Sequence, residues 1–560
     1  MPYKSPLSDI RFILDHVVPL APVTATDRFA EATPDMVEAV LTEAAKLCDT
    51  VIAPLNRAGD QHGAALGADG VQATPGFDGA YRQIAQGGWV SVSADPDYGG
   101  MGLPQSLAVA INDMMSGACL ALQLKPLLSQ GQIEALEHHA DNALKALYLP
   151  KLVSGEWSGT MNLTEPQAGS DVGALRSRAE PLADGTFAVS GQKIFISWGD
   201  SDLVSNVCHL VLARLPDAPA GIKGISLFMV PKFLPDAKGE PGARNGVTVV
   251  SLEHKLGLHG SPTCVMEFDG ATGWMVGEPN KGMAAMFTMM NNARLAVGVQ
   301  GIGVAEAACQ QALAYAQDRV QFAPIVQHPD VKRMLTQMRA EIFAARSIAL
   351  ACSVALDLAR ATGSGDWQAR AALLTPIAKS YGTDVGCRVA DLGIQVHGGM
   401  GFIEETGAAQ FFRDVRVTAI YEGTNGIQAM DLVGRKMMDQ GRAALTLLQE
   451  IEDEATAARD QLPDLAEAVW QAAESLREAT EWLVAQSMED RFAGAAPYLQ
   501  AFAHVLGAHY HLRAGLADPG RVALARAFVL RILPRHLADI AELRAGGAGL
   551  SALSVEDLGT

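Results

Sequence analysis

One carboxylate in this sequence has the neighbours expected of a group that removes protons. In the segment Ile-Tyr-Glu-Gly-Thr-Asn, Glu422 lies between Tyr421 and Gly423. Glycine has no Cβ, so a ligand can approach the backbone beside it. An apolar neighbour limits water around a carboxylate and raises its pKa toward the range useful for a general base. Alternatively, Glu422 simply precedes a helix that has Thr424 or Asn425 as its N-cap.

A second glycine-rich turn, Gln-Val-His-Gly-Gly-Met-Gly-Phe at residues 395–402, precedes this carboxylate. Between the two turns lie Arg413, Asp414 and Arg416, which we interpret as a structural ion-pair network. His397 has two glycines beside it and no evident carboxylate to orient it. We therefore expect His397 to pack in its loop rather than to act as a base.

Length and composition exclude several classes of protein. The chain has 560 residues, too many for one hydrophobic core, so two to four domains are expected. Apolar residues make up 49% and charged residues 19%, which is typical of a well-cored globular protein. The formal net charge of -19 argues against nucleic acid as the main partner. The seven cysteines are scattered without a C-x-x-C, which predicts reduced thiols in the cytoplasm and no metal site.

The sequence does not predict integral membrane association. Lys4 and Asp9 interrupt any apolar signal-peptide core at the N-terminus. The most apolar run, Leu107–Leu124, contains Asn112 and Asp113. We expect this run to be a buried helix rather than a membrane span.

The elements that must position these residues fall into blocks of different periodicity. Residues 1–34 are rich in proline and are expected to wrap over the surface as a lead-in. The first 150 residues otherwise predict only helices, because apolar residues recur at spacings of three and four. These helices are expected at 35–47, 77–85, 103–124, 130–139 and 141–153.

From Gly159 the pattern changes to short alternating segments separated by turn residues, which predicts a small β-barrel or sandwich. Strands are expected at 186–190, 193–197, 209–213, 225–230, 246–250 and 263–268.

After Gly282 the helical period returns, and the lengths predict four antiparallel helices. They are expected at 287–313, at 331–358, at 371–396 and from about Ile427 onward. A last helical block follows, in which Leu465, Val469 and Leu476 share one face. This block has more acidic than basic residues, which argues against a DNA-binding tail. We interpret the block as an addition that packs on the protein or forms oligomers.

The predicted fold is therefore mainly α with a small β domain, in five parts. The lead-in is followed by a helical N-terminal domain, a middle β-barrel or sandwich, a four-helix bundle that carries Glu422 and an extra helical C-terminal domain. The boundaries are 1–34, 35–157, 158–280, 281–438 and 439–560.

Three motifs on this succession resemble the acyl-CoA dehydrogenase family of flavoproteins. They are Met-Asn-Leu-Thr-Glu-Pro-Gln-Ala-Gly-Ser-Asp-Val at 161–172, Arg-Val-Gln-Phe at 319–322 and Ile-Tyr-Glu-Gly-Thr at 420–424. The resemblance covers residues from about 35 to 436. The added C-terminal block resembles the longer bacterial branch, which includes enzymes for 3-methylmercaptopropionyl-CoA and for longer-chain acyl-CoAs.

The resemblance implies that Glu422 is the catalytic base. Some members carry the base on the first bundle helix, immediately before an arginine that resembles Arg294. Here the preceding residue is Ala293, which cannot take a proton, and the assignment to Glu422 is strengthened. The implied reaction removes the α-proton of an acyl-CoA thioester while a hydride passes from its β-carbon to flavin N5. The product is a trans-2-enoyl-CoA.

The resemblance also implies an FAD cofactor and the residues that hold it. The residues implied to hold the flavin ring are Met161, Leu163, Thr164, Gly169, Ser170, Phe195, Ile196 and Ser197. At the position of Phe195 the family often has tryptophan. The residues implied to bind the pyrophosphate and adenine half of FAD are Arg319, Phe322, Gln395, Gly398 and Gly399. In the family these residues usually come from a neighbouring subunit, which implies a homodimer. Thr424 and Asn425 match a turn that meets the phosphates. The sequence departs from the family at Ala323 and Asp330, where glycine and glutamine are common.

Substrate contacts are implied for Ser170, Asn291, Arg294 and Gly423. An electron-transferring flavoprotein is the implied electron acceptor, and the location is expected to be cytoplasmic. The acyl group stays open between 3-methylmercaptopropionyl and short or medium-to-long straight chains. Two alternatives remain: an acyl-CoA oxidase that passes electrons to O₂, and a non-catalytic relative that binds acyl-CoA or nucleic acid.

Overall fold

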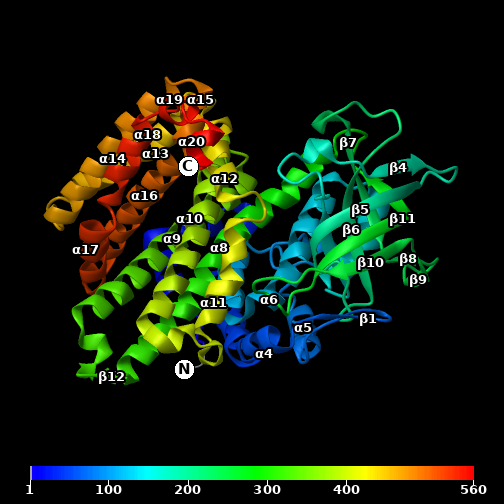
Figure 1. The fold of residues 1–560 in the computed structure, drawn as a ribbon, viewed down its shortest axis with the longest axis horizontal. Helices are drawn as coiled ribbons and strands as arrows, with labels where there is room; N and C mark the ends of the chain where they lie inside the picture. The colour runs from blue at the N-terminus through cyan, green and yellow to red at the C-terminus, as the bar shows by residue number, and fades with distance from the viewer. Residues whose placement is uncertain (1–2, 560) are drawn as a thin grey trace.

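The computed structural model describes residues 3–559, and it places a β domain at one side of a larger helical body. Figure 1 shows the strands gathered on the right and the long helices on the left. The predicted fold class, mainly α with one small β domain, is confirmed. The first two residues of the predicted lead-in lie outside the described part of the chain.

The N-terminal domain is helical, but two expectations about it are wrong. A short hairpin, β1 (Ala65–Gly67) and β2 (Gly70–Gln72), interrupts the helices because a glycine turn lets Val71 join the β-domain core. The lead-in is not confined to the surface, since Ile10 and Val17 are completely buried. The remaining helices are α1 (Leu7–Phe12), α2 (Ala21–Thr24), α3 (Pro34–Leu47), α4 (Asn56–His62), α5 (Phe77–Gln86), α6 (Gln105–His139) and α7 (Asn142–Val153).

Helix α6 joins two segments that the sequence predicted as separate helices. The gap between the two predicted segments contains Pro126, which lies inside the helix. The irregularity falls earlier, at Cys119, where φ is -162° and ψ is 97°. Proline inside a helix removes one backbone hydrogen bond, and close packing on all sides of α6 keeps the helix together.

The β domain is a barrel, because its strands close into a ring. The order β10-β11-β5-β4-β6-β3 is completed by β7, which pairs with both β11 and β6. Two predicted strands are one strand, β5, because the chain stays paired with β11 on both sides of Gly191, where φ is 140°. The strands are β3 (Trp157–Asn162), β4 (Arg178–Pro181), β5 (Phe187–Ser197), β6 (Asn206–Arg214), β7 (Ile225–Pro231), β10 (Val247–Leu252) and β11 (Thr263–Val276), with a separate ribbon of β8 (Phe233–Pro235) and β9 (Pro241–Arg244).

Three long helices of the bundle are as predicted: α8 (Gly282–Asp318), α9 (Pro329–Thr362) and α10 (Gly365–His397). The fourth is not the helix that follows Glu422. That helix, α12 (Asn425–Val433), ends after nine residues at Gly434, and α11 (Ala408–Val415) is also short. The long helix that packs against α8 and α9 is instead α6 of the N-terminal domain.

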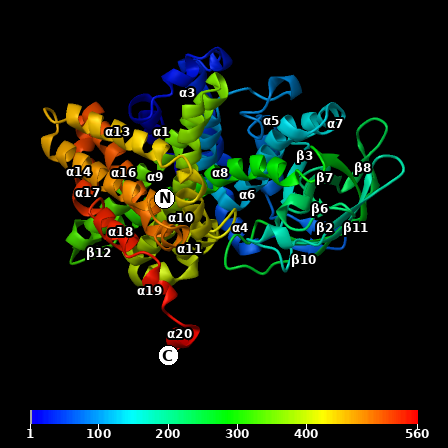
Figure 2. The same ribbon diagram turned by 90° about the horizontal axis from the view of Figure 1, so that it is seen from above.

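The C-terminal domain packs against the bundle as a continuation of its core. Its central helix, α16, is buried for most of its length and contacts α9, α10 and α12. Both views show these helices at the side opposite the β domain, and Figure 2 shows the last two extending outward. The helices are α13 (Arg442–Ala457), α14 (Pro463–Val484), α15 (Met488–Ala493), α16 (Ala495–Ala517), α17 (Val522–Arg531), α18 (Arg535–Arg544), α19 (Ala548–Ser551) and α20 (Val555–Gly559).

Within the described residues, α6 and α9 are long and apolar enough to cross a membrane by length and composition. Most of their apolar stretches are buried inside the protein. The expectation that Leu107–Leu124 lies within a buried helix is therefore confirmed.

Helices α8 and α10 cross at glycines that allow their backbones to touch. A Cβ added at Gly298 would lie 2.5 Å from the carbonyl oxygen of Ala378, and one added at Gly382 would lie 2.5 Å from that of Gly298. Real Cβ atoms do not approach backbone oxygens so closely, so only glycine permits this separation of the helix axes.

We expect Gly382→Ala to destabilise the protein by about 1–3 kcal/mol, because the added methyl group forces the two backbones apart. Gly365→Ala in the same helix is the matched control, since nothing lies within 4 Å of its Cβ position. Chemical denaturation of both variants measures the difference. Equal stability of the two variants would contradict the close-packing argument.

Candidate active site

The Glu422 turn has an unusual backbone conformation. Glu422 has φ 56° and Gly423 has φ 85°, so two consecutive residues are left-handed. This conformation costs a non-glycine residue about 1–2 kcal/mol. The side chain of Gln428 donates a hydrogen bond to the Glu422 carbonyl at 3.2 Å. Thr424 caps α12 by accepting from the Ile427 N–H at 3.2 Å, so the capped turn and the candidate base belong to the same segment.

Two cations face the Glu422 carboxylate. Burial raises the pKa of Glu422 to about 7, and the positive charges of Arg294 on α8 and Lys379 on α10 oppose that rise. Burial also lowers the pKa of Lys379 to about 8, against the influence of Glu422 and Asp384. The site therefore combines an acid and a base that both titrate near neutral pH.

Buried amides connect the turn to two long helices. The Tyr421 hydroxyl donates a short hydrogen bond to Gln300 on α8. Gln300 donates to Gln123 on α6 at 2.8 Å, and Gln123 donates to Asn112 at 3.1 Å. This network satisfies the polar groups of α6 inside the core and fixes Tyr421 beside the carboxylate.

The two segments expected to hold the flavin lie together in the β domain. The Ile194 N–H donates to the carbonyl oxygen of Thr164 at 2.9 Å. The Lys193 ammonium donates to the Leu163 carbonyl at 3.1 Å and to Glu165 at 2.8 Å. Lys193 is fully buried and Glu165 is nearly so, so this ion pair holds the loop against β5 in a dry environment.

The exposed groups of these segments could hold a flat ring. Phe195 has φ 61° and an exposed fraction of 60%, which is unusual for a large apolar side chain. Ser197 and Met161 are half-buried, and Gly169 and Ser170 are exposed. Ile196 differs from the others because its side chain packs in the barrel core, which leaves only its backbone for a ligand.

The residues expected at the pyrophosphate and adenine half are not brought to Glu422 within one chain. Arg319 follows the last turn of α8, 25 residues after Arg294, a separation of about 37 Å along the helix. Figure 1 shows β12 (Val320–Gln321) at the end of the bundle remote from the β domain. Phe322 lies at this end with φ 62° and full exposure, and so do Gln395, Gly398 and Gly399, all exposed.

Two of the expected ligand-binding residues have protein partners. The Arg294 guanidinium lies 3.5 Å from Asp431 and donates to Asn291 at 3.4 Å. The Asn425 amide points into the bundle, where it accepts from Lys379 at 2.9 Å and donates to Asp384 at 2.7 Å. Only the backbone of Asn425 is therefore free to meet a phosphate. The ligand-binding roles of all these residues stay predictions.

Sequence reasoning missed Lys379 and Asp384. Both lie in the apolar helix α10, and Lys379 is fully buried. A lysine flanked by apolar residues in a predicted bundle helix is the signal that could have drawn attention to it, because a buried ammonium requires a partner.

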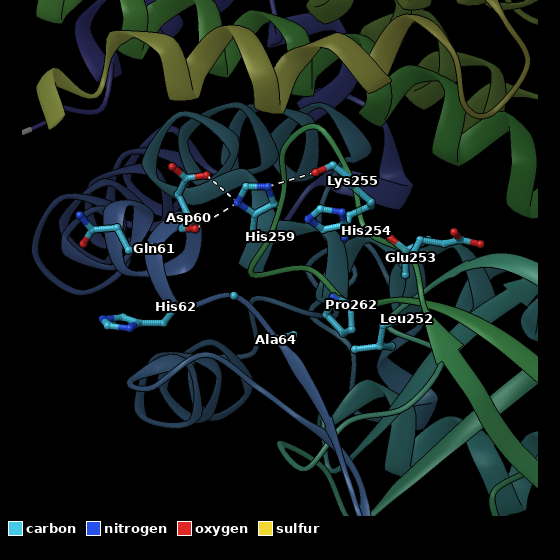
Figure 3. Close-up of a pocket in the computed structure, with 12 residues that line it drawn as sticks. Asp60, Gln61, His62, Ala64, Leu252, Glu253, His254, Lys255, His259 and Pro262 are labelled. Carbon is cyan, nitrogen blue, oxygen red and sulfur yellow. Dashed lines mark hydrogen bonds and ion pairs between the residues drawn. The ribbon is translucent and has the colours of Figure 1, made fainter. Parts of the chain in front are cut away.

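A separate cavity of about 250 Å³ lies between α4 and the loop that joins β10 to β11. Figure 3 shows His259 directed at Asp60, with 3.0 Å between its Nδ1 atom and the carboxylate. None of the expected site residues lines this cavity. Asp60 also pairs with Arg413 at 2.6 Å, and Asp414 accepts from the Leu258 N–H at 2.6 Å. Arg413 thus belongs to an ion-pair network as expected, whereas Asp414 bonds to a backbone N–H and to Gln410. The exposed Arg416 has no ion pair within residues 3–559, so the expected three-residue network is wrong at Asp414 and Arg416.

His397 ends α10, where it stacks on Tyr315 with ring centroids 4.4 Å apart. Its Nδ1 atom lies 2.7 Å from the Gly393 carbonyl oxygen. The expectation that His397 packs rather than acts as a base agrees with these contacts.

Family models for the N-terminal, middle and C-terminal domains of acyl-CoA dehydrogenase match residues 34–156, 160–271 and 280–438. A fourth, described as acetyl-CoA dehydrogenase C-terminal like, matches residues 447–554. The chain belongs to the acyl-CoA dehydrogenase family. It is an oxidoreductase of that family, and its cofactor is FAD.

Individual relatives are similar in sequence over most of the length of this chain. The chain is 45% identical to 3-methylmercaptopropionyl-CoA dehydrogenase of Ruegeria pomeroyi, over 89% of this chain and 88% of that one. It is 34% identical to the broad-specificity linear acyl-CoA dehydrogenase FadE5 of Mycobacterium tuberculosis, over 80% and 78%. In fold it is similar to Caenorhabditis elegans ACDH-11 in complex with C11-CoA, with a TM-score of 0.80, 20% identity and coverage of 94% and 91%.

The residues at the two flavin segments fit this cofactor. They offer an exposed aromatic face at Phe195, hydroxyl groups at Thr164 and Ser197, and backbone groups on both sides. The one acidic side chain buried between them, Glu165, is paired with Lys193 and does not repel the electron-rich ring. Isoalloxazine requires such flat, polar-edged surroundings.

We expect Lys193→Met to release FAD and to destabilise the protein by about 3–5 kcal/mol, because Glu165 would remain buried without its partner. Lys151→Met is the matched control, since Lys151 pairs with half-exposed acids at 2.9 Å, and exposed pairs contribute about 0–1 kcal/mol. Flavin absorbance after gel filtration and denaturant unfolding measure both effects. A Lys193→Met protein that kept FAD and stability would show that the pair does not hold the loop.

Proposed function

We propose that Glu422 is the base of an acyl-CoA dehydrogenation that converts a saturated thioester to a trans-2-enoyl-CoA. The observation that carries this proposal is the position of Glu422, on a left-handed turn between Arg294 and Lys379, with its pKa raised to about 7 by burial. A base with that pKa is about half ionised at neutral pH and still binds a proton well.

The α-C–H of a thioester is a weak acid, so the developing negative charge on the carbonyl oxygen must be stabilised. Within residues 3–559, the backbone N–H of Glu422 donates to no other protein atom. Gly423 has no Cβ to block the approach to that N–H. The donor and the base therefore belong to the same residue. FAD supplies, when bound, the acceptor for the hydride that leaves the β-carbon.

The two cations bias the Glu422 side chain toward its charged form before reaction. Arg294 and Lys379 lower its pKa, whereas burial raises it, and the opposing effects leave the carboxylate poised near neutrality. The α-proton moves to a Glu422 oxygen as the hydride leaves. The neutral acid formed is favoured by the same low-water environment that raised its pKa.

For the acyl group we propose 3-methylmercaptopropionyl-CoA, and short or medium-to-long straight chains are the alternative. The identity of 45% to the Ruegeria enzyme supports the thioether substrate. Anaerobic bleaching of the yellow protein by a panel of acyl-CoAs distinguishes them. Peroxide formed in air at the rate of turnover would instead identify an oxidase.

We further propose a cytoplasmic homodimer that passes electrons to an electron-transferring flavoprotein. Six of the seven cysteines are buried and all are free, as expected for a reducing compartment. The adenine-half residues Arg319 and Phe322 are exposed at the end of the bundle remote from Glu422. A fully exposed phenylalanine is typical of a surface that another protein covers, and this is the observation that supports a subunit contact at Phe322.

We expect Glu422→Gln to retain FAD and to lose at least about 10²–10⁴ in the rate of flavin bleaching, because the amide cannot accept the α-proton. Stopped-flow reduction under anaerobic conditions measures this rate. Glu405→Gln is the control, since Glu405 is exposed in the turn Glu404–Thr406. Near-normal turnover by Glu422→Gln would refute the assignment.

The pH dependence provides a second readout of the same prediction. The pKa of Glu422 is raised to about 7, and only the ionised form is a base. The rate should therefore be constant at high pH and fall about tenfold per unit below pH 7. A wild-type profile flat down to pH 5 would exclude Glu422 as the titrating group.

We expect Phe322→Asp to dissociate the protein and to weaken FAD binding, because a charge replaces the apolar contact with the partner. Sedimentation velocity reports the oligomeric state, and flavin absorbance reports occupancy. Ile222→Asp is the control, since Ile222 is 56% exposed in the β domain. If Phe322→Asp kept the wild-type mass and full FAD content, Phe322 would not lie at a subunit interface.

A further inference from the structure

The C-terminal domain contacts the bundle directly behind the Glu422 turn. Helix α16 packs against both α10 and α12. From α16, the half-buried Gln500 donates a hydrogen bond to an oxygen of Asp384 on α10 at 2.6 Å. This is a side-chain link between the C-terminal domain and the helix that carries Lys379.

The other oxygen of Asp384 faces the turn. It accepts from the Asn425 amide at 2.7 Å, and Asn425 is the first residue of α12, three positions after Glu422. The side-chain oxygen Oδ1 of Asn425 accepts from the Lys379 ammonium at 2.9 Å. Thr383 also bonds to Asn425, at 3.0 Å and 3.2 Å. An unbroken series of contacts therefore leads from Gln500 to Lys379.

The charges along this series alternate in sign. Lys379 faces the carboxylates of Glu422 and Asp384, together with Arg294 and the Cys387 thiol. Glu422 and, after it, Asp384 are the carboxylates that raise the pKa of Lys379 against burial.

Asp384 in turn faces Arg388 and Lys379. Burial raises the pKa of Asp384, and Arg388 together with the hydrogen bonds from Asn425 and Gln500 opposes that rise. The Gln500 amide therefore helps to keep Asp384 ionised.

We propose that Gln500, Asp384 and Asn425 are positioning residues through which the C-terminal domain holds a protonated Lys379 beside Glu422. This inference rests on the proposed role of Glu422 as the base. It assigns a function to the C-terminal domain beyond packing, because the first residue of the series belongs to that domain and the last faces the carboxylate.

The direction of the effect follows from the charges. An ionised Asp384 favours the Lys379 ammonium, and that ammonium favours the Glu422 carboxylate. When Gln500 is lost, the ionised form of Asp384 is less favoured, and Lys379 loses part of its counter-charge. Glu422 then needs a higher pH to become a base, so the acidic limb of the pH profile moves upward.

The test compares the Gln500→Ala holoenzyme with the wild-type holoenzyme. The rate of flavin bleaching by butyryl-CoA and by 3-methylmercaptopropionyl-CoA is measured by anaerobic stopped flow between pH 5 and 9. We expect the acidic limb to move up by about half a unit, so that the rate falls about threefold at pH 6. Near pH 9 the rates should coincide. A merely structural defect would lower the rate at every pH.

Three further variants complete the design. Lys379→Met should move the acidic limb by about one unit or more, and Lys379→Arg should keep it near the wild-type position because the charge remains. Gln471→Ala is the control for Gln500→Ala, since its exposed amide bonds only to Glu467 within the same domain. That control should leave the profile unchanged.

The outcomes separate this inference from the proposed function. If Glu422→Gln abolishes bleaching but the limbs of Gln500→Ala and Lys379→Met coincide with the wild type, the positioning role is wrong and the base assignment stands. A pH-independent loss in Gln500→Ala would also overturn the positioning role. Normal bleaching by Glu422→Gln would overturn the function itself.

Discussion

The Glu422 carboxylate is held away from bulk water between two cations, and this balance of burial and charge is what the fold must maintain. Removing a carboxylate from water raises its pKa, and a cation within reach lowers it by about 1–3 units. In this protein burial outweighs the two cations, which leaves the pKa of Glu422 raised to about 7. A small displacement of Arg294 or Lys379 would shift that balance, so their helices must be rigidly placed.

Direct contact between α8 and α10 provides that rigidity. Arg294 lies four residues before Gly298 on α8, and Lys379 lies three residues before Gly382 on α10. The two glycines meet where a Cβ would clash with the opposite backbone. Backbone contact leaves little freedom for the helices to slide, because close-packed surfaces resist small shifts. The cations therefore project from the most tightly packed part of the bundle.

The sequence predicts where helices lie in the chain better than it predicts which helices pack against one another. Apolar periodicity located α8, α9 and α10, because it reports which face of a helix is buried. It does not report what lies against that face, and so α6 was not recognised as the fourth long helix of the bundle. The three motifs led to Glu422 and the family, whereas Lys379 and Asp384 depend on contacts between residues more than 40 positions apart. Contacts between residues so far apart produce no pattern in a short stretch of sequence.

The expected ligand-binding residues divide between the two ends of one helix. Arg294 and Arg319 are both on or next to α8, yet about 37 Å apart along it. Arg294 is expected beside the substrate and Arg319 beside the adenine half of FAD, so one chain does not bring these two parts of the expected site together. In the proposed homodimer, a two-fold axis would place the Phe322 end of one chain at the flavin end of the other and would complete two equivalent sites at once. Subunit association would then be part of the cofactor site, and the partner would cover Phe322.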